Sequence, residues 1–292
     1  MYLRASEIWQ KVLPPNHPTI AGISKHLAAV FDGEGRYAEA EPLYKKALRI
    51  RDESLSRRHP LYAASLKNLA VFYSDQASYG LAERLFNEAL DLQKHTVDVD
   101  PRDVAGTLNG LANIYVQQGN YTKAEENFSA ELETWRKDNP HGAGVATASN
   151  NLGIVYLQQN DLDRAEASFL RALDIRTALY GDTHPDVAAV KRNLAEVYTR
   201  RRRYSEAEKL LTEASAADIA TLGERHLAVV EILNDLGFVL HKEGKTSAAR
   251  ERFERARRLL LAVKRDNVGL DDESARGLFS DRRQHWPVMP PH

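Results

Sequence analysis

The sequence repeats itself with a period close to 42 residues. Six leucines mark the period, and successive leucines are 42, 42, 41, 42 and 42 residues apart: Leu27, Leu69, Leu111, Leu152, Leu194 and Leu236. An alanine returns thirteen residues after each leucine, and an aromatic residue or leucine follows four residues after that alanine. Such a period predicts stacked copies of one small unit that bury a continuous core, rather than a single globular core.

The spacing within each repeat is helical. The leucine, the small residue after it and the residue four positions on share one stripe of a helix with 3.6 residues per turn. The later alanine and its aromatic partner form the same stripe on a second helix. Glycine-containing breaks such as 32–35 and 118–120 separate the two helices, and His-Pro or Asp-Pro pairs precede most first helices. Proline is tolerated at a first helical position. The pattern predicts helix pairs over about 18–57, 60–98, 102–138, 143–180, 185–222 and 227–265.

These repeats resemble tetratricopeptide repeats (TPRs). The Asn-Leu-Ala and Ala-Glu-Pro-Leu-Tyr-Lys-Lys-Ala-Leu segments and the His-Pro pairs are similar to the 42-residue repeats of kinesin light chains and their bacterial relatives. The resemblance implies an all-α, right-handed α-solenoid of tandem antiparallel helix pairs. We expect a partial repeat over 1–17, which contributes a second helix only, six repeats forming one solenoid domain over 18–265, and a mobile or loosely docked tail over 266–292.

Composition narrows the function. The formal net charge is −1, which argues against a nucleic-acid or membrane-surface binder, because both depend on excess positive charge. The chain has no cysteine and no apolar run of the roughly 20 residues needed to span a bilayer. With no secretory signal at its start, we expect a cytoplasmic protein. No phosphate-binding loop, zinc motif or nucleophile elbow is present, so we expect neither an enzyme nor a cofactor.

The helix face opposite the buried stripe is rich in amides. It falls one residue before, two after and six after each leucine, and in TPR proteins, by resemblance, it lines a concave groove. The candidate peptide-binding residues on this face and beside it are Lys67, Asn68, Asn109, Asn113, Gln117, Asn150, Asn151, Gln158, Arg192, Asn193 and Arg200. An amide side chain both donates and accepts, so it can pair with the backbone of an extended peptide.

The cations on this face suggest a charge preference. Lys67, Arg192 and Arg200 would select acidic residues through charge-assisted hydrogen bonds. The resemblance points the same way, since asparagines before this leucine in kinesin light chains line a groove for extended acidic peptides. The alternative is that the asparagines cap local backbone or face water. A TPR clamp for C-terminal carboxylates is disfavoured, because Ala29 and Val71 stand where it needs asparagine.

Other polar groups have structural explanations. His17, His59, His184 and His226 recur once per repeat beside a helix start, which favours capping or packing over a metal site. The run over 200–203 and the arginines between 250 and 258 suggest a solvated surface, or otherwise a patch for an acidic partner.

Repeat three departs from the pattern. Glu131 replaces the small packing alanine, and one residue is missing between Leu111 and Leu152. Because an unpaired carboxylate at a close helix contact costs several kcal/mol, we expect a register shift that moves Glu131 to the surface and kinks the array.

The sequence therefore predicts a non-enzymatic scaffold for protein interactions that binds an extended peptide in its groove, with the cations of this face suggesting acidic peptides. The alternative is a regulatory or sensor module that holds an effector protein inactive within a larger signalling system. The partial first repeat motivates this alternative. The sequence indicates neither the identity of the partner nor an oligomeric state.

Overall fold

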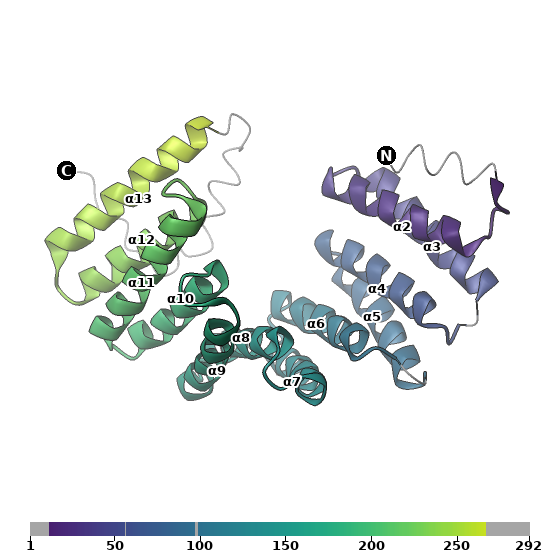
Figure 1. Cartoon of the computed structure of the whole chain (residues 1–292), viewed down its shortest axis with the longest axis horizontal. Helices are drawn as coiled ribbons and strands as arrows, with labels where there is room; N and C mark the ends of the chain where they lie inside the picture. The colour runs from purple at the N-terminus through teal and green to yellow at the C-terminus, as the bar shows by residue number, and fades with distance from the viewer. Residues whose placement is uncertain (1–11, 56, 97–98, 267–292) are drawn as a thin grey trace. The chain divides into compact units, whose positions relative to one another are not determined.

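The described part of the chain is entirely helical and loop. The computed structural model describes residues 12–55, 57–96 and 99–266, and these form paired helices and no strand (Figure 1). The helices are α2 (Pro18–Gly33), α3 (Tyr37–Ser54), α4 (Pro60–Asp75), α5 (Tyr79–Lys94), α6 (Pro101–Gln117), α7 (Tyr121–Asp138), α8 (Ala143–Gln158), α9 (Leu162–Tyr180), α10 (Pro185–Arg200), α11 (Tyr204–Leu222), α12 (Leu227–Lys242) and α13 (Thr246–Asp266). The six predicted helix pairs and the all-α solenoid class are confirmed. Most of the partial repeat expected over 1–17 falls outside the described residues, as does the tail beyond 266.

Histidines cap the first helices. The Nδ1 atoms of His17, His59, His184 and His226 each accept a hydrogen bond from the backbone N–H two residues later, over 3.1 to 3.2 Å. Asp100 does the same for α6 with its carboxylate, over 2.8 Å. Each bond satisfies one of the amide donors that a helix start leaves without a partner. The capping role predicted for the repeated histidines is confirmed.

The turn inside each repeat depends on one residue in the left-handed conformation. It recurs with the period of the leucines, and its φ angle lies between 54° and 86° at Gly35, Ala77, Gly119, Asn160, Arg202 and Gly244. The next residue donates its N–H to the carbonyl five residues back, as Asn120 does to Tyr115 over 2.8 Å. Glycine adopts this conformation without strain, whereas in alanine and arginine the Cβ atom lies too close to the backbone and destabilises the turn.

Small residues let the helices approach closely. The alanines thirteen residues after the leucines are all at most 2% exposed. A Cβ atom added to Gly153 would lie 2.6 Å from the Phe169 ring, and one added to Gly237 would lie 2.7 Å from the Phe253 ring. Such distances are far below van der Waals contact, so glycine is required where these rings pack.

Neighbouring repeats are also joined by hydrogen bonds. The Tyr73 hydroxyl donates to Glu41 over 2.8 Å, and the Tyr115 hydroxyl donates to Glu83 over 2.7 Å. In each pair the glutamate belongs to the second helix of one repeat, and the tyrosine belongs to the first helix of the next. The period therefore sets polar contacts between repeats as well as the apolar core.

The chain divides into two compact units. The N-terminal unit extends to Ile175 and the C-terminal unit starts at Arg176, so the boundary falls inside α9. Helices α2 to α8 belong to the N-terminal unit, and α10 to α13 belong to the C-terminal unit. The single solenoid domain expected over 18–265 stays a prediction, and the candidate residues are described unit by unit.

Candidate functional site

In the N-terminal unit, α4, α6 and α8 carry amide side chains beside their buried leucines. Asn68 and Asn151 stand directly before Leu69 and Leu152, are half-buried, and make no hydrogen bond to another described residue. A half-buried amide gains from a partner because its donor and acceptor are partly removed from water. Other predicted amides of this unit are exposed, namely Asn113, Gln117 and Gln158, whereas Asn109 and Asn150 are half-buried and have partners.

The Lys67 side chain forms an ion pair with another residue of the N-terminal unit. Its Nζ atom lies 2.9 Å from Oδ1 of Asp103, so the ion pair joins α4 to α6. The Lys67 side chain also lies against α6 at Gly106, where an added Cβ atom would be 3.4 Å from Nζ. The carboxylate neutralises the charge that sequence reasoning assigned to an acidic ligand.

The cations of the C-terminal unit are paired as well. Arg192 on α10 lies 2.5 Å from Glu231 and 3.0 Å from Asp235, both on α12, and its side chain is 20% exposed. Burial alone would lower the pKa of Arg192, but these two carboxylates raise it on balance. Arg200 lies 2.8 Å from Glu196, and the neighbouring Asn193 also has a partner. Among the described residues, each of the three cations expected to select acidic ligands therefore has a carboxylate of its own.

The expectation for Glu131 is wrong. Instead of reaching the surface, this side chain is 3% exposed. Its Oε2 atom accepts from Nδ2 of Asn109 over 3.1 Å, and its Oε1 atom accepts from Nε1 of Trp135 over 3.3 Å. Burial raises its pKa from 4.5 to about 7, against the effect of the two hydrogen bonds. The carboxyl is buried because two neutral donors satisfy it, and no register shift exposes it.

Gly144 makes room for this arrangement. A Cβ atom added there would lie 2.2 Å from Cδ2 of Trp135, so only glycine lets the indole ring pack against the start of α8. Glu131, Trp135 and Gly144 depart from what the other repeats carry at these positions, whereas the asparagine of Asn109 recurs at Asn150 and Asn234. The sequence signal that could have revealed the cluster is the concentration of these departures over residues 131–144.

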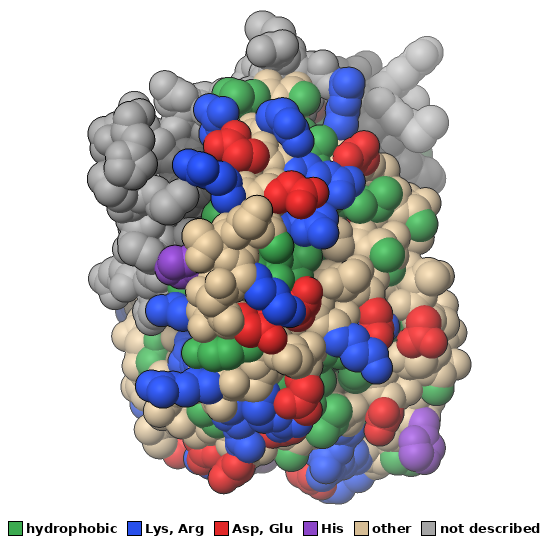
Figure 2. Space-filling view, turned by 90° about the vertical axis from the view of Figure 1, so that its left-hand side faces the viewer, with side chains coloured by type: hydrophobic (Ala, Val, Ile, Leu, Met, Phe, Trp, Pro, Cys, Tyr) green, Lys and Arg blue, Asp and Glu red, His purple; other side chains and the backbone are tan. Residues whose placement is uncertain are grey.

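The arginine-rich segment over 200–203 forms a turn that contacts of neighbouring side chains stabilise. Arg203 pairs with Glu206 and stacks 4.0 Å from the centroid of the Tyr198 ring, while Arg202 has a φ angle of 60°. On the face shown in Figure 2, blue Lys and Arg side chains lie among red Asp and Glu side chains, with no large area of blue alone among the described residues. The ion pairs of Arg203 with Glu206 and of Arg257 with Glu254 agree with the interpretation of these arginines as a solvated surface.

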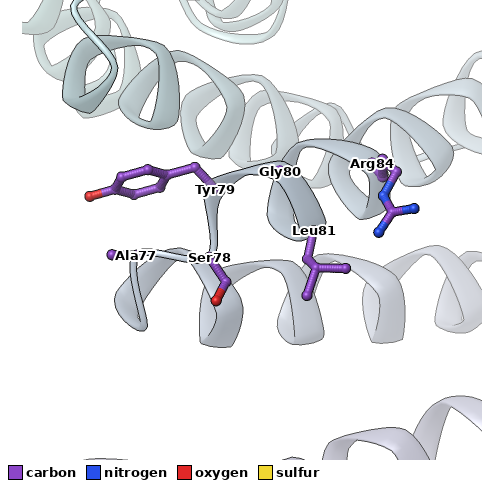
Figure 3. A pocket seen from close by; sticks show the side chains of 6 residues that line it. All are labelled: Ala77, Ser78, Tyr79, Gly80, Leu81 and Arg84. Atoms are coloured by element: carbon purple, nitrogen blue, oxygen red, sulfur yellow. The ribbon is translucent and has the colours of Figure 1, made fainter.

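One open hollow lies at the turn between α4 and α5. Figure 3 shows the side chains that line it: Ala77, Ser78, Tyr79, Gly80, Leu81 and Arg84. It is wide open to solvent and holds no pair of groups suited to catalysis, so it carries no functional assignment. Within the described residues no cluster of His, Asp or Glu is arranged to hold a metal ion, and no helix is long and apolar enough to span a membrane.

Comparison with known proteins identifies the family. The sequence profile of the tetratricopeptide repeat matches residues 1–53, 19–95, 103–178, 145–219 and 186–262. The chain belongs to the tetratricopeptide repeat family, whose repeats form modules for protein–protein interaction. A comparison with curated protein sequences finds no match.

Several solved structures are similar. BtubC (BKLC) from P. vanneervenii is 23% identical with a TM-score of 0.66, and the match covers 84% of this chain and 92% of BtubC. A STAND signal-transduction ATPase with a TPR sensor, PH0952 from Pyrococcus horikoshii, is 14% identical with a TM-score of 0.74, over 94% of this chain and 41% of that protein. A putative kinesin light chain from Podosopora anserina is 18% identical, over 85% of this chain and 98% of that one, with a TM-score of 0.43. The first two likenesses show the shared fold and no more.

Proposed function

We propose that this protein is a non-enzymatic interaction scaffold whose N-terminal unit binds an extended peptide segment of a partner protein. The observation that carries the proposal is the pair of half-buried amides at Asn68 and Asn151, which have no hydrogen-bond partner among the described residues. They occupy the same position of two repeats, so they recur along one row of helices. Amides in such a row suit the N–H and C=O groups of an extended backbone.

The proposed ligand is not specifically acidic. Lys67 is neutralised by Asp103, and Arg192 is neutralised by Glu231 and Asp235. Recruiting either cation to a ligand would break an existing pair and leave its carboxylate partners without their counter-charge. Recognition through backbone hydrogen bonds requires no such exchange.

The test uses a peptide selected on the parent protein from a random phage-displayed library. Replacing Asn68 and Asn151 together by alanine should weaken binding by about 1–3 kcal/mol, as expected for two ordinary hydrogen bonds. The matched control is Asn127→Ala on α7, where the amide bonds its own helix at the carbonyl of Lys123. Equal affinity of the parent and double variant, measured by calorimetry, would place the binding site elsewhere.

A regulatory role is the second candidate. The fold shared with a protein described as having a TPR sensor supports it. In this role the array would hold an effector protein inactive, and a pull-down would recover one stoichiometric protein instead of a series of peptides. The cytoplasmic location also stays a prediction under either role.

A further inference from the structure

The buried carboxyl of Glu131 is connected to the peptide-binding face by a chain of hydrogen bonds. Nδ2 of Asn109 donates to Oε2 of Glu131 over 3.1 Å, and Nδ2 of Asn113 donates to Oδ1 of Asn109 over 2.9 Å. Asn109 and Asn113 are one turn apart on α6. The chain therefore runs from a side chain that is 3% exposed to one that is exposed on the surface.

The direction of this chain follows from the chemistry of the carboxylate. An ionised carboxylate only accepts hydrogen bonds, so Asn109 must turn its Nδ2 atom towards Glu131. The Oδ1 atom of Asn109 then faces Asn113 and accepts a hydrogen bond from its Nδ2–H group. As a result, Oδ1 of Asn113 makes no hydrogen bond within the described residues and is available at the surface.

We propose that Glu131 is a positioning residue that acts through Asn109, orienting the Asn113 amide so that α6 presents an oxygen acceptor to backbone N–H groups of a bound peptide. The inference rests on the proposed function for the binding step, but the hydrogen-bond chain itself exists without a ligand. An asparagine amide can present either its oxygen or its NH₂ group to a ligand. The hydrogen-bond chain decides that Asn113 presents its oxygen.

Protonation of Glu131 reverses the chain. A protonated carboxyl has an O–H group that needs an acceptor, and the indole Nε1–H of Trp135 can only donate. Of the two side chains that bond the carboxyl, only Asn109 has an acceptor, its Oδ1 atom, so Asn109 turns over and presents Nδ2 to Asn113. Asn113 then turns its own oxygen inward and presents its NH₂ group at the surface. Because burial raises the Glu131 pKa to about 7, this change falls near neutral pH.

Few other charges act on Glu131. The residues three and four positions away on α7 are uncharged: Asn127, Phe128, Thr134 and Trp135. Helix α8, which packs against α7, contains no Asp, Glu, Lys, Arg or His.

The titratable groups of α6 and α8 either have partners of their own or lie at the far end of the helix from Asn109. On α6, Asp103 is paired with Lys67, and the Tyr115 hydroxyl bonds Glu83. Arg102 lies in the first turn of α6, two turns before Asn109. On α8, the hydroxyl of Tyr156 is hydrogen-bonded to Glu125. The protonation of Glu131 is therefore the event that should reverse the amides.

The first test needs no ligand. In ¹⁵N–¹H spectra of the full chain, the Trp135 indole and the Asn113 side-chain amide should shift together between about pH 5.5 and 8.5, with a midpoint near 7. In Glu131→Gln neither should shift with this midpoint, whereas in the matched control Glu133→Gln, an exposed residue paired with Arg136, both should shift as in the parent. Titration of the indole with a stationary Asn113 amide would overturn the inference.

The second test measures binding. The affinity for the library-selected peptide, chosen on the parent at about pH 8, should fall about tenfold at pH 6, as expected when an acceptor is replaced by an opposed donor. Glu131→Gln should bind weakly at both values, because its NH₂ group donates to Asn109 permanently. An equal pH dependence in the parent and the variant would refute the positioning role.

The two tests separate two failures. If the library yields no binding peptide, the proposed function fails, yet the spectra still decide whether Glu131 orients Asn113. If Glu131→Gln does not fold, Glu131→Ala replaces it, because alanine stands at this position in the other five repeats. In that variant Asn109 is released, so the Asn113 amide should lose its titration near pH 7.

Discussion

Replacing Glu131 by glutamine should stabilise the protein above neutral pH. The folded-state pKa of this carboxyl is raised from 4.5 to about 7, mainly by burial. Between these two values the folded state retains a proton that the unfolded state has lost, so stability falls as the pH rises through this window. A difference of one pKa unit between the folded and unfolded states corresponds to about 1.4 kcal/mol of stability. The ionised carboxyl therefore costs roughly 3 kcal/mol of stability once the pH exceeds 7, and glutamine avoids this cost.

The assay compares urea unfolding of the parent and Glu131→Gln between about pH 4.5 and 8. The difference in free energy of unfolding should be near zero at the acidic end and approach roughly 3 kcal/mol in favour of the variant at the alkaline end. Because stability in repeat arrays is distributed, hydrogen exchange of α6, α7 and α8 should show the same pH-dependent difference locally.

Glu133→Gln is the control for this experiment. Glu133 is on the same helix but its side chain is 59% exposed, so the difference from the parent should not grow over this window. A Glu131→Gln protein that is no more stable than the parent at pH 8, or whose advantage is the same at pH 5, would refute the argument from burial.

Three other substitutions, each with a matched control, test the local geometry by urea unfolding. Ala77→Gly should stabilise by up to about 1 kcal/mol because φ is 54° there, whereas Ala29→Gly, inside α2, should destabilise by about 1. His59→Ala should cost about 1 kcal/mol through loss of the α4 cap, and His59→Asp should retain it. Gly144→Ala should cost about 1–3 kcal/mol, since the new methyl would overlap the indole ring, while Gly106→Ala has room and should not destabilise.

The sequence alone was sufficient to predict the repeating helix pairs. Leucine, alanine and aromatic spacing predicted each helix pair, since every repeat must bury the same stripe against its neighbours. Recurrence also predicted the capping role of the histidines, because a cap depends on backbone only two residues away. Local geometry and a period are both readable without knowing how the repeats meet.

Only the tertiary structure decided which polar groups are free. Lys67 pairs with Asp103, 36 residues away, and Arg192 reaches carboxylates on the next repeat. Helical phase places a side chain on a face, but it does not say which neighbour's side chain stands opposite. Asn68 and Asn151 share that phase and yet have no partner among the described residues.

Glu131 is the clearest case in which the sequence does not reveal the neighbouring side chains. A carboxylate in an alanine position predicted exposure, because the cost of burying it is large when it stands alone. The fold instead brings Asn109 and Trp135 to its two oxygens, and Gly144 makes space for the indole ring. The period determined where the helices run, whereas the three-dimensional meeting of these four residues decided that the carboxyl is buried.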